Sequence, residues 1–145
     1  MIHRLISLMC LAAMLTPSGN GQASDNPAHE YPKKMVNRLK KLAGSGATDC
    51  GIVGIWQPAD AANNCALSAF RARKPFFVRH AFQGIDTLQV SGYAGDQKGD
   101  VYSVSFWSDL DADPDDGHLS VERCSRPVNL RIAHAGWLTC FLRDP

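Results

Sequence analysis

The acidic segment 109–117 holds the densest group of potential metal ligands in this chain. A calcium loop needs several carboxylate oxygens, delivered at alternate positions by a tightly turning backbone. Counted from Asp111, four carboxylates fall on ligand positions of the EF-hand template. They are Asp111, Asp113, Asp115 and Glu122. The spacing therefore predicts a candidate calcium site.

Two features of the segment depart from that template. Asp116 stands where the EF-hand loop has a glycine, and Gly117 comes one place late. The flanking residues alternate as in strands, which would draw Glu122 away from the ion. A solvated hairpin loop is the alternative interpretation, because aspartate, proline and glycine are the usual turn residues. The segment is therefore predicted either to bind calcium or to hold no cofactor.

The histidines beyond residue 23 are His29, His80, His118 and His134. None of them has the His-x-x-x-His or Cys-x-x-His spacing of a local zinc site, so a zinc site would have to combine distant segments. His118 adjoins the acidic segment. His80 alternates in phase with Phe76, Val78 and Phe82, which favours a hydrogen-bonded histidine in the core or at its edge.

Signatures of catalysis are absent from the sequence. It has no Gly-x-Ser-x-Gly elbow, no Ser-x-x-Lys pair and no glycine-rich phosphate loop. Asp86 is in phase with apolar residues of a strand, but its place at the strand start favours a turn cap. We therefore predict no catalytic residue. A small hydrolase that pairs His80, His118 or His134 with Asp86 or with an acidic-segment aspartate is kept as an alternative.

Four cysteines remain if the first 23 residues are removed: Cys50, Cys65, Cys124 and Cys140. An even number of cysteines in an exported chain predicts two disulfides, and four cysteines allow three connectivities. We favour Cys50–Cys65 with Cys124–Cys140, because each pair lies within one short stretch of sequence. A four-thiolate metal site is disfavoured, because the chain has no Cys-x-x-Cys spacing.

Residues 1–23 have the three-part pattern of a bacterial secretory signal. A short basic start is followed by the apolar run 5–15, and Gly21 and Ala23 are the small residues that a signal peptidase reads. The run is too short to span a membrane, which takes roughly 20 apolar residues. Met9 before Cys10 argues against a lipid anchor on that cysteine. We predict a periplasmic or secreted protein with no transmembrane segment.

The charge is divided unevenly along the chain. Residues 24–46 carry five basic and two acidic side chains, and residues 47–145 carry nine basic and twelve acidic ones. Neither balance is typical of a nucleic-acid-binding protein. Residues 24–46 are predicted to be a polar leader with a basic amphipathic helix over 33–43, which would pack on the domain, stay partly disordered or contact an anionic surface. A single domain is predicted over 47–145.

The apolar spacing predicts one main helix over 59–73, because its small apolar residues recur on one face and Pro75 follows it. Alternating apolar residues predict strands at 50–56, 76–82, 87–93, 101–108, around 119–121, 128–132 and 137–142. A hairpin turn is predicted at 96–100. The expected fold is α+β, with the helix covering a mostly antiparallel sheet of about five to six strands, and a small β-barrel is the alternative.

Three functional hypotheses follow from these features. The first is a non-enzymatic module that binds an envelope component or a protein, with an inhibitor as one form of such a module. Binding would use exposed aromatic residues such as Trp56, Trp107 and Trp137. The second is a calcium-stabilised extracytoplasmic domain. The third is the small hydrolase described above. The identity of the partner does not follow from the sequence.

Overall fold

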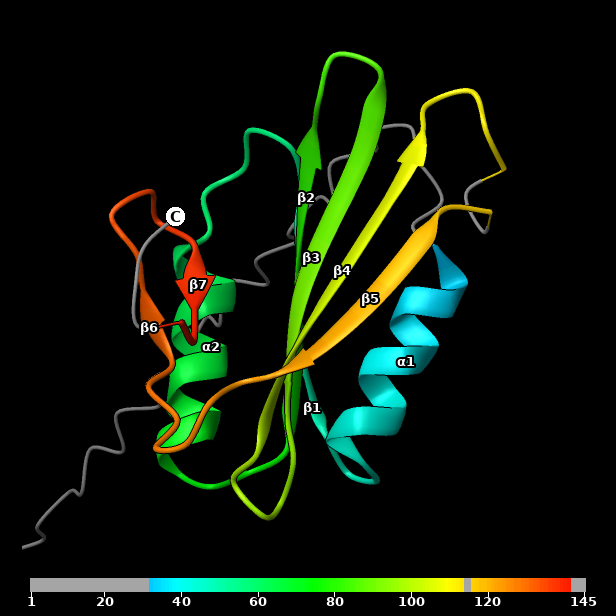
Figure 1. Ribbon diagram of the computed structural model, residues 1–145. Coiled ribbons are helices and arrows are strands. Elements are labelled where there is room, and N and C mark those ends of the chain that lie inside the picture. The colour runs from blue at the N-terminus through cyan, green and yellow to red at the C-terminus, as the bar shows by residue number, and fades with distance from the viewer. Residues whose placement is uncertain (1–31, 114–115, 142–145) are drawn as a thin grey trace, which may run out of the picture.

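The computed structural model describes residues 32–113 and 116–141 (Figure 1). Two helices and seven strands follow one another in this part of the chain. They are α1 (Lys33–Ala43), β1 (Thr48–Val53), α2 (Asp60–Arg71), β2 (Phe76–Gln83), β3 (Thr87–Gly95), β4 (Val101–Asp109), β5 (His118–Arg123), β6 (Arg131–Ile132) and β7 (Leu138–Thr139). The predicted signal segment 1–23 lies outside the described residues.

Five strands form one open sheet in the order β1-β2-β3-β4-β5. β1 and β2 are parallel and are joined through α2, and the remaining neighbours are antiparallel. β6 and β7 pair only with each other, as a small hairpin beside α2. The α+β prediction is confirmed. The barrel alternative is wrong, because β1 and β5 do not pair and each leaves an edge of the sheet open.

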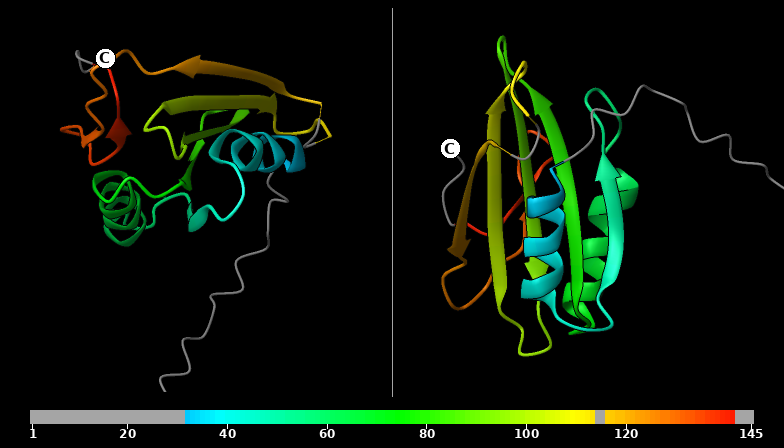
Figure 2. Two further views of the ribbon diagram at one scale, coloured as in Figure 1. Left: turned by 90° about the horizontal axis from the view of Figure 1, so that it is seen from below. Right: turned by 90° about the vertical axis from the view of Figure 1, so that its right-hand side faces the viewer.

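α1 covers one face of the sheet, against β2, β3 and β4 (Figure 2). Its apolar residues recur at every fourth position, so Met35, Leu39 and Ala43 are all buried, while Lys33, Lys40 and Lys41 are exposed. Gly92 of β3 permits the close approach, because a Cβ there would lie 2.9 Å from the Leu39 side chain and 2.8 Å from the Val78 carbonyl oxygen. The compact fold therefore includes residues 33–43.

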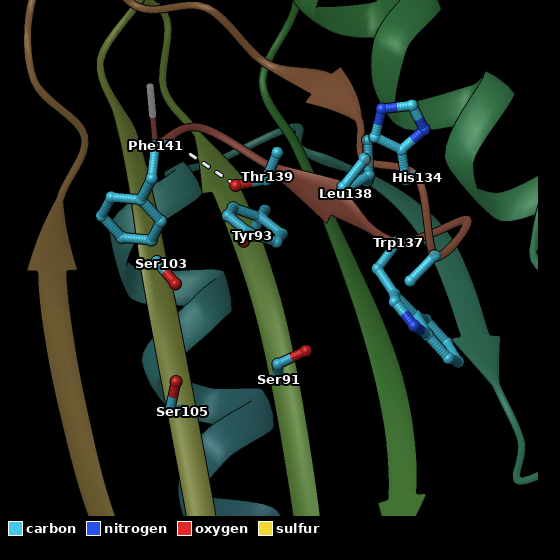
Figure 3. A pocket seen from close by; sticks show the side chains of 11 residues that line it. Ser91, Tyr93, Ser103, Ser105, His134, Trp137, Leu138, Thr139 and Phe141 are labelled. Atoms are coloured by element: carbon cyan, nitrogen blue, oxygen red, sulfur yellow. Dashed lines mark hydrogen bonds between the residues drawn. The ribbon is translucent and has the colours of Figure 1, made fainter. Parts of the chain in front are cut away.

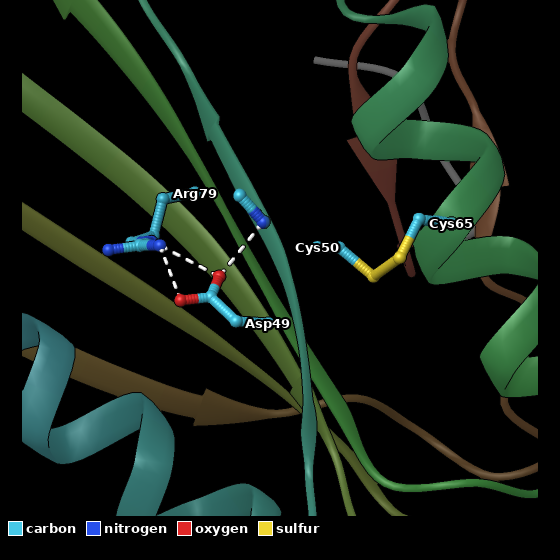
Figure 4. Close-up of a disulfide and its surroundings, with 5 residues drawn as sticks. Asp49, Cys50, Cys65 and Arg79 are labelled. Carbon is cyan, nitrogen blue, oxygen red and sulfur yellow. Dashed lines mark hydrogen bonds and ion pairs between the residues drawn. A yellow bond between two sulfur atoms is a disulfide. The ribbon is translucent and has the colours of Figure 1, made fainter. Parts of the chain in front are cut away.

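α2 lies on the opposite face, against β1 and β2. The small residues Ala66 and Ala69 are buried there, which brings the helix close to the sheet. The Cys50–Cys65 disulfide ties β1 to this helix (Figure 4). Beside it, Arg79 of β2 donates from Nη2 to both carboxylate oxygens of Asp49 of β1, at 2.8 and 2.9 Å.

The second disulfide joins Cys124, just after β5, to Cys140, just after β7. It fastens the C-terminal hairpin to the end of the sheet. Both disulfides are the ones predicted from the short sequence separation within each pair. Each closes a loop of about the same length, with sequence separations of 15 and 16.

Alternation along the strands produces two cores, one on each face. The α1 side buries Phe77, Val90, Val104 and Phe106 among others. The α2 side buries Phe76, Val78, Tyr93 and Val101 together with Cys124 and Cys140. On this second face, α2 and the hairpin cover only part of β3, β4 and β5, so polar side chains of these strands stay accessible.

The structure differs from the predicted elements mainly near the C-terminus. The predicted strands 128–132 and 137–142 shorten to β6 and β7, which have two residues each. Val128 and Leu130 are buried or partly buried against the core without strand pairing. Their alternation therefore reflects packing on the sheet and not membership in it.

Candidate functional site

The main candidate site is a pocket of about 570 Å³ between the open face of the sheet and the β6–β7 hairpin. Figure 3 shows serine side chains of β3 and β4 on one side and hairpin residues on the other. The lining residues are Ser91, Tyr93, Ser103, Ser105, Ala133, His134, Ala135, Trp137, Leu138, Thr139 and Phe141. Among residues 32–113 and 116–141, no lysine, arginine, aspartate or glutamate belongs to this lining. We call this the hairpin pocket.

Hydroxyl groups form the sheet side of the hairpin pocket. Ser91 pairs directly with Ser105 across β3 and β4, and Tyr93 pairs with Ser103. Since residues two apart on a strand share a face, all four side chains point to the same side. The Tyr93 side chain hydrogen-bonds with Ser103 and Thr139, and burial raises the pKa of its phenol. The pocket floor therefore presents neutral donors and acceptors.

An aromatic wall faces these hydroxyls from the hairpin. Trp137 lies in the pocket lining, and its ring packs at an angle of 60° against Phe82 of β2, with centroids 4.4 Å apart. The His80 ring meets the Trp137 ring edge-on, with centroids 5.8 Å apart and an interplanar angle of 85°. Phe141 closes another side of the pocket. These contacts hold the indole in a fixed place beside the row of hydroxyls.

A buried hydrogen-bonded chain positions the hairpin turn. Nε2 of His80 donates to Oδ1 of Asn63 of α2 over 2.8 Å. Nδ2 of the same asparagine donates to the carbonyl oxygen of Gly136, also over 2.8 Å. His80 and Asn63 are each 1% exposed. The chain thus links β2, α2 and the turn next to Trp137 without using a charge.

Burial lowers the pKa of His80 from 6.5 to about 4. The imidazole is therefore neutral near pH 7, and because Oδ1 of Asn63 only accepts, its proton is on Nε2. The sequence prediction of a hydrogen-bonded core histidine agrees with this position. His80 acts on the hairpin pocket from behind and does not line it.

The other residues considered for catalysis lie in separate places. His134 lines the hairpin pocket, whereas His118 is at the start of β5, where its ring lies 4.2 Å from that of Trp107. Asp86 is exposed in the turn between β2 and β3. Within residues 32–113 and 116–141, no hydrogen bond joins a histidine to a carboxylate. The hydrolase hypothesis thus lacks an acid–base pair among these groups.

The four predicted calcium ligands are spread over the β4–β5 connection and β5. Asp111 and Asp113 lie in the connection, and Asp115 lies outside the described residues. Glu122 is on β5, opposite Ser103 of β4 and four residues past His118. Among the residues described, no three His, Cys, Asp or Glu side chains are close enough to hold a metal ion. The calcium site stays a prediction.

Sequence reasoning did not find the hairpin pocket. The only local signal was the row of serines at alternate positions of β3 and β4, which is typical of a solvated strand face. The aromatic wall comes from a segment more than 25 positions further along the chain, and nothing near the serines indicates where that segment folds back. Trp137 was singled out only as an exposed aromatic residue.

Comparison with known proteins gives no match, whether to a family model, to a curated sequence or to a solved structure. The described helices are too short and too polar to cross a membrane.

Proposed function

We propose that this protein is an extracytoplasmic binding module whose hairpin pocket takes a neutral ligand rich in hydroxyl groups, such as a saccharide unit of the cell envelope. The observation that carries the proposal is the lining itself. One side offers Ser91, Ser105 and other hydroxyls, the other offers the Trp137 ring, and the described lining residues include no lysine, arginine, aspartate or glutamate.

Saccharides present both kinds of surface that this pocket provides. Their hydroxyl groups need donors and acceptors, and serine, threonine and tyrosine hydroxyls serve as both. Their C–H faces are apolar and pack on aromatic rings, which combine a large apolar area with a polar edge. A charged ligand would instead lose its hydration without gaining an opposite charge. The pocket volume of about 570 Å³ is in the range of small-ligand sites.

The pocket walls are fixed by bonds that do not depend on a ligand. The Cys124–Cys140 disulfide lies next to Thr139 and Phe141 of the lining. The chain through Asn63 fixes the turn at Gly136, beside Trp137. A site that is already ordered loses less conformational entropy on binding, which favours affinity.

The location part of the proposal is supported by two disulfides, since such bonds persist in oxidising compartments. The predicted signal at residues 1–23 is consistent with export. An envelope component is favoured over a protein partner because the recognised surface is a pocket lined by small hydroxyl groups and not a broad apolar patch.

Isothermal titration with neutral envelope oligosaccharides tests this function. We expect binding by the native protein and a loss of roughly tenfold or more in affinity for Trp137→Ala, because the half-buried aromatic wall of the pocket is removed. Trp137→Phe should retain part of the affinity, since it keeps an aromatic face.

Trp56→Ala is the matched control for that titration. Trp56 is 97% exposed and lies outside the pocket lining, so its removal should leave the affinity unchanged. Equal losses for the Trp56 and Trp137 variants would contradict the proposal, as would a native protein that binds no neutral saccharide.

A further inference from the structure

A second pocket, of about 520 Å³, lies between the C-terminal end of α2, the β3–β4 turn and the segment after β5. Its lining residues are Phe70, Arg71, Arg73, Gln97, Lys98, Gly99, Arg126, Pro127 and Val128. It shares no lining residue with the hairpin pocket. We call it the basic pocket.

The basic pocket concentrates positive charge. Of the lining residues that the structure describes, four are cationic, namely Arg71, Arg73, Lys98 and Arg126, and none is acidic. This concentration is local, because residues 47–145 carry nine basic and twelve acidic side chains in all. Neither Arg71 nor Arg73 nor Lys98 forms an ion pair within the described part of the chain.

Arg126 is held at the pocket by a buried carboxylate. Asp100 is 6% exposed as a residue, and it accepts hydrogen bonds from Arg123 at 2.6 Å and from Nε of Arg126 at 2.8 Å. These two partners lower the pKa of Asp100, with Arg123 the larger cause, so the carboxylate stays ionised near pH 7. Two guanidinium groups on one carboxylate leave an excess of positive charge, and the Arg126 side chain is 60% exposed.

Arg73 adopts a backbone conformation that most residues avoid. Its φ is 52°, in the left-handed region, at the position just after the C-cap of α2. The Arg73 N–H donates to the Phe70 carbonyl oxygen over 3.0 Å, and the Lys74 N–H donates to the Ala69 carbonyl oxygen over 2.9 Å. These two bonds form the Schellman motif, which ends many helices. Glycine is the usual residue there, because it has no Cβ to strain.

The helix end does not account for an arginine at this strained position. Cations offset the negative end of a helix dipole, but Arg71 and Lys74 already lie next to it on either side. Residues other than glycine that are held in this conformation cluster at functional sites. Arginine is also the side chain best suited to bind phosphate oxygens, since its N–H groups form a planar fork.

We propose that the basic pocket binds a phosphate group, carried either by a free small molecule or by a phospholipid headgroup. Four cations around one cavity supply the charge, and the fixed Arg126 with Arg73 supplies directed donors. The turn residues Gln97 and Gly99 add a side-chain amide and backbone on the third side. The site is separate from the hairpin pocket and does not depend on the function proposed for it.

The variant Arg73→Gly separates binding from folding. Glycine relieves the strain at φ 52°, so the melting temperature should stay the same or rise. The affinity for inorganic phosphate, measured by isothermal titration at low ionic strength against matched chloride, should fall about fivefold or more. Lys98→Gln should weaken phosphate binding similarly. The turn should stay intact in this variant, because the backbone N–H of residue 98 still donates to Asp96.

Lys74→Gln is the matched control, because Lys74 is a neighbouring exposed cation outside the pocket lining. It should bind phosphate like the native protein. An equal loss for Lys74→Gln and Arg73→Gly would overturn the proposal, since binding would then follow net charge alone.

Vesicles distinguish the two sources of the phosphate group. Sedimentation with phosphatidate vesicles, compared with pure phosphatidylcholine vesicles, measures headgroup binding. Loss of phosphatidate binding in Arg73→Gly supports the headgroup, and binding of inorganic phosphate alone supports a free ligand. A native protein that binds neither probe would overturn the proposal.

Discussion

His80 is a buried residue that helps to position the hairpin turn and Trp137. It donates to Asn63, which donates to the carbonyl oxygen of Gly136, so β2, α2 and the hairpin turn are joined by neutral hydrogen bonds. Breaking this chain would leave buried polar groups without partners, which typically costs about 1–3 kcal/mol for each group. The position of Trp137 in the hairpin pocket therefore depends on a residue that never contacts a ligand.

The low pKa of His80 predicts a specific pH dependence of stability. Well above pH 6.5 the imidazole is neutral in both the folded and the unfolded state. As the pH falls from 6.5 towards 4, the unfolded chain binds a proton that the native state excludes, so the free energy of unfolding decreases. The full decrease from this group is roughly 3 kcal/mol. Urea unfolding at pH 7.0, 6.0, 5.0 and 4.0 follows this decrease.

Two variants control for the other groups that titrate in this range. In His80→Gln the new side chain does not titrate and still offers an N–H to Asn63. The free energy of unfolding of this variant should therefore depend less on pH. His134→Gln should keep the native dependence, because this variant retains His80 and its hydrogen bond to Asn63. A native slope in His80→Gln would show that another group is responsible.

The C-terminal hairpin is the element that converts a polar sheet face into a pocket. β6 and β7 have two residues each and pair only with each other, so strand pairing holds them weakly. The Cys124–Cys140 disulfide and the buried side chains of Leu130 and Leu138 attach the hairpin to the rest of the fold. The pocket should thus respond to loss of this disulfide more than to loss of the other.

The two disulfides provide a matched pair of variants. Because their loops are of nearly equal length, replacing either pair by serine should lower the free energy of unfolding by a similar amount, about 3 kcal/mol in the chain-entropy model. Only the Cys124→Ser/Cys140→Ser variant should also lose saccharide affinity, as measured by titration under conditions where both variants are folded. Equal affinity losses in the two variants would contradict a special role for the hairpin attachment.

At the scale of the whole molecule, the sequence predicted most elements and both disulfides but not the site. Alternation places a residue on one side of a strand, and helical spacing does the same for α2, so the core around Phe76 on the α2 side could be predicted. The second core, around Phe77 under α1, was not predicted. Neither pattern tells which distant segment covers a given face. Ser91 and Ser105 alternate with apolar residues as solvated strand positions do, and only the fold shows that the hairpin lies above them.

Two further features depend on long-range packing in the same way. The apolar stripe of α1 indicated a helix, but only the close approach at Gly92 shows where it packs. The basic residues near the end of α2 formed one group in the sequence. In the fold they separate, with Arg79 paired to Asp49 and Arg73 turned to the basic pocket beside Arg126.

The central claim is that the hairpin pocket is a binding site for a neutral, hydroxyl-rich ligand. Amide chemical shifts of the isotope-labelled protein, followed during titration with neutral envelope oligosaccharides, test it most directly. The account predicts that saturable shift changes concentrate at pocket residues such as Ser91, Ser105, Trp137 and Thr139. Absence of saturable changes, or changes confined to the α1 side of the sheet, would contradict it.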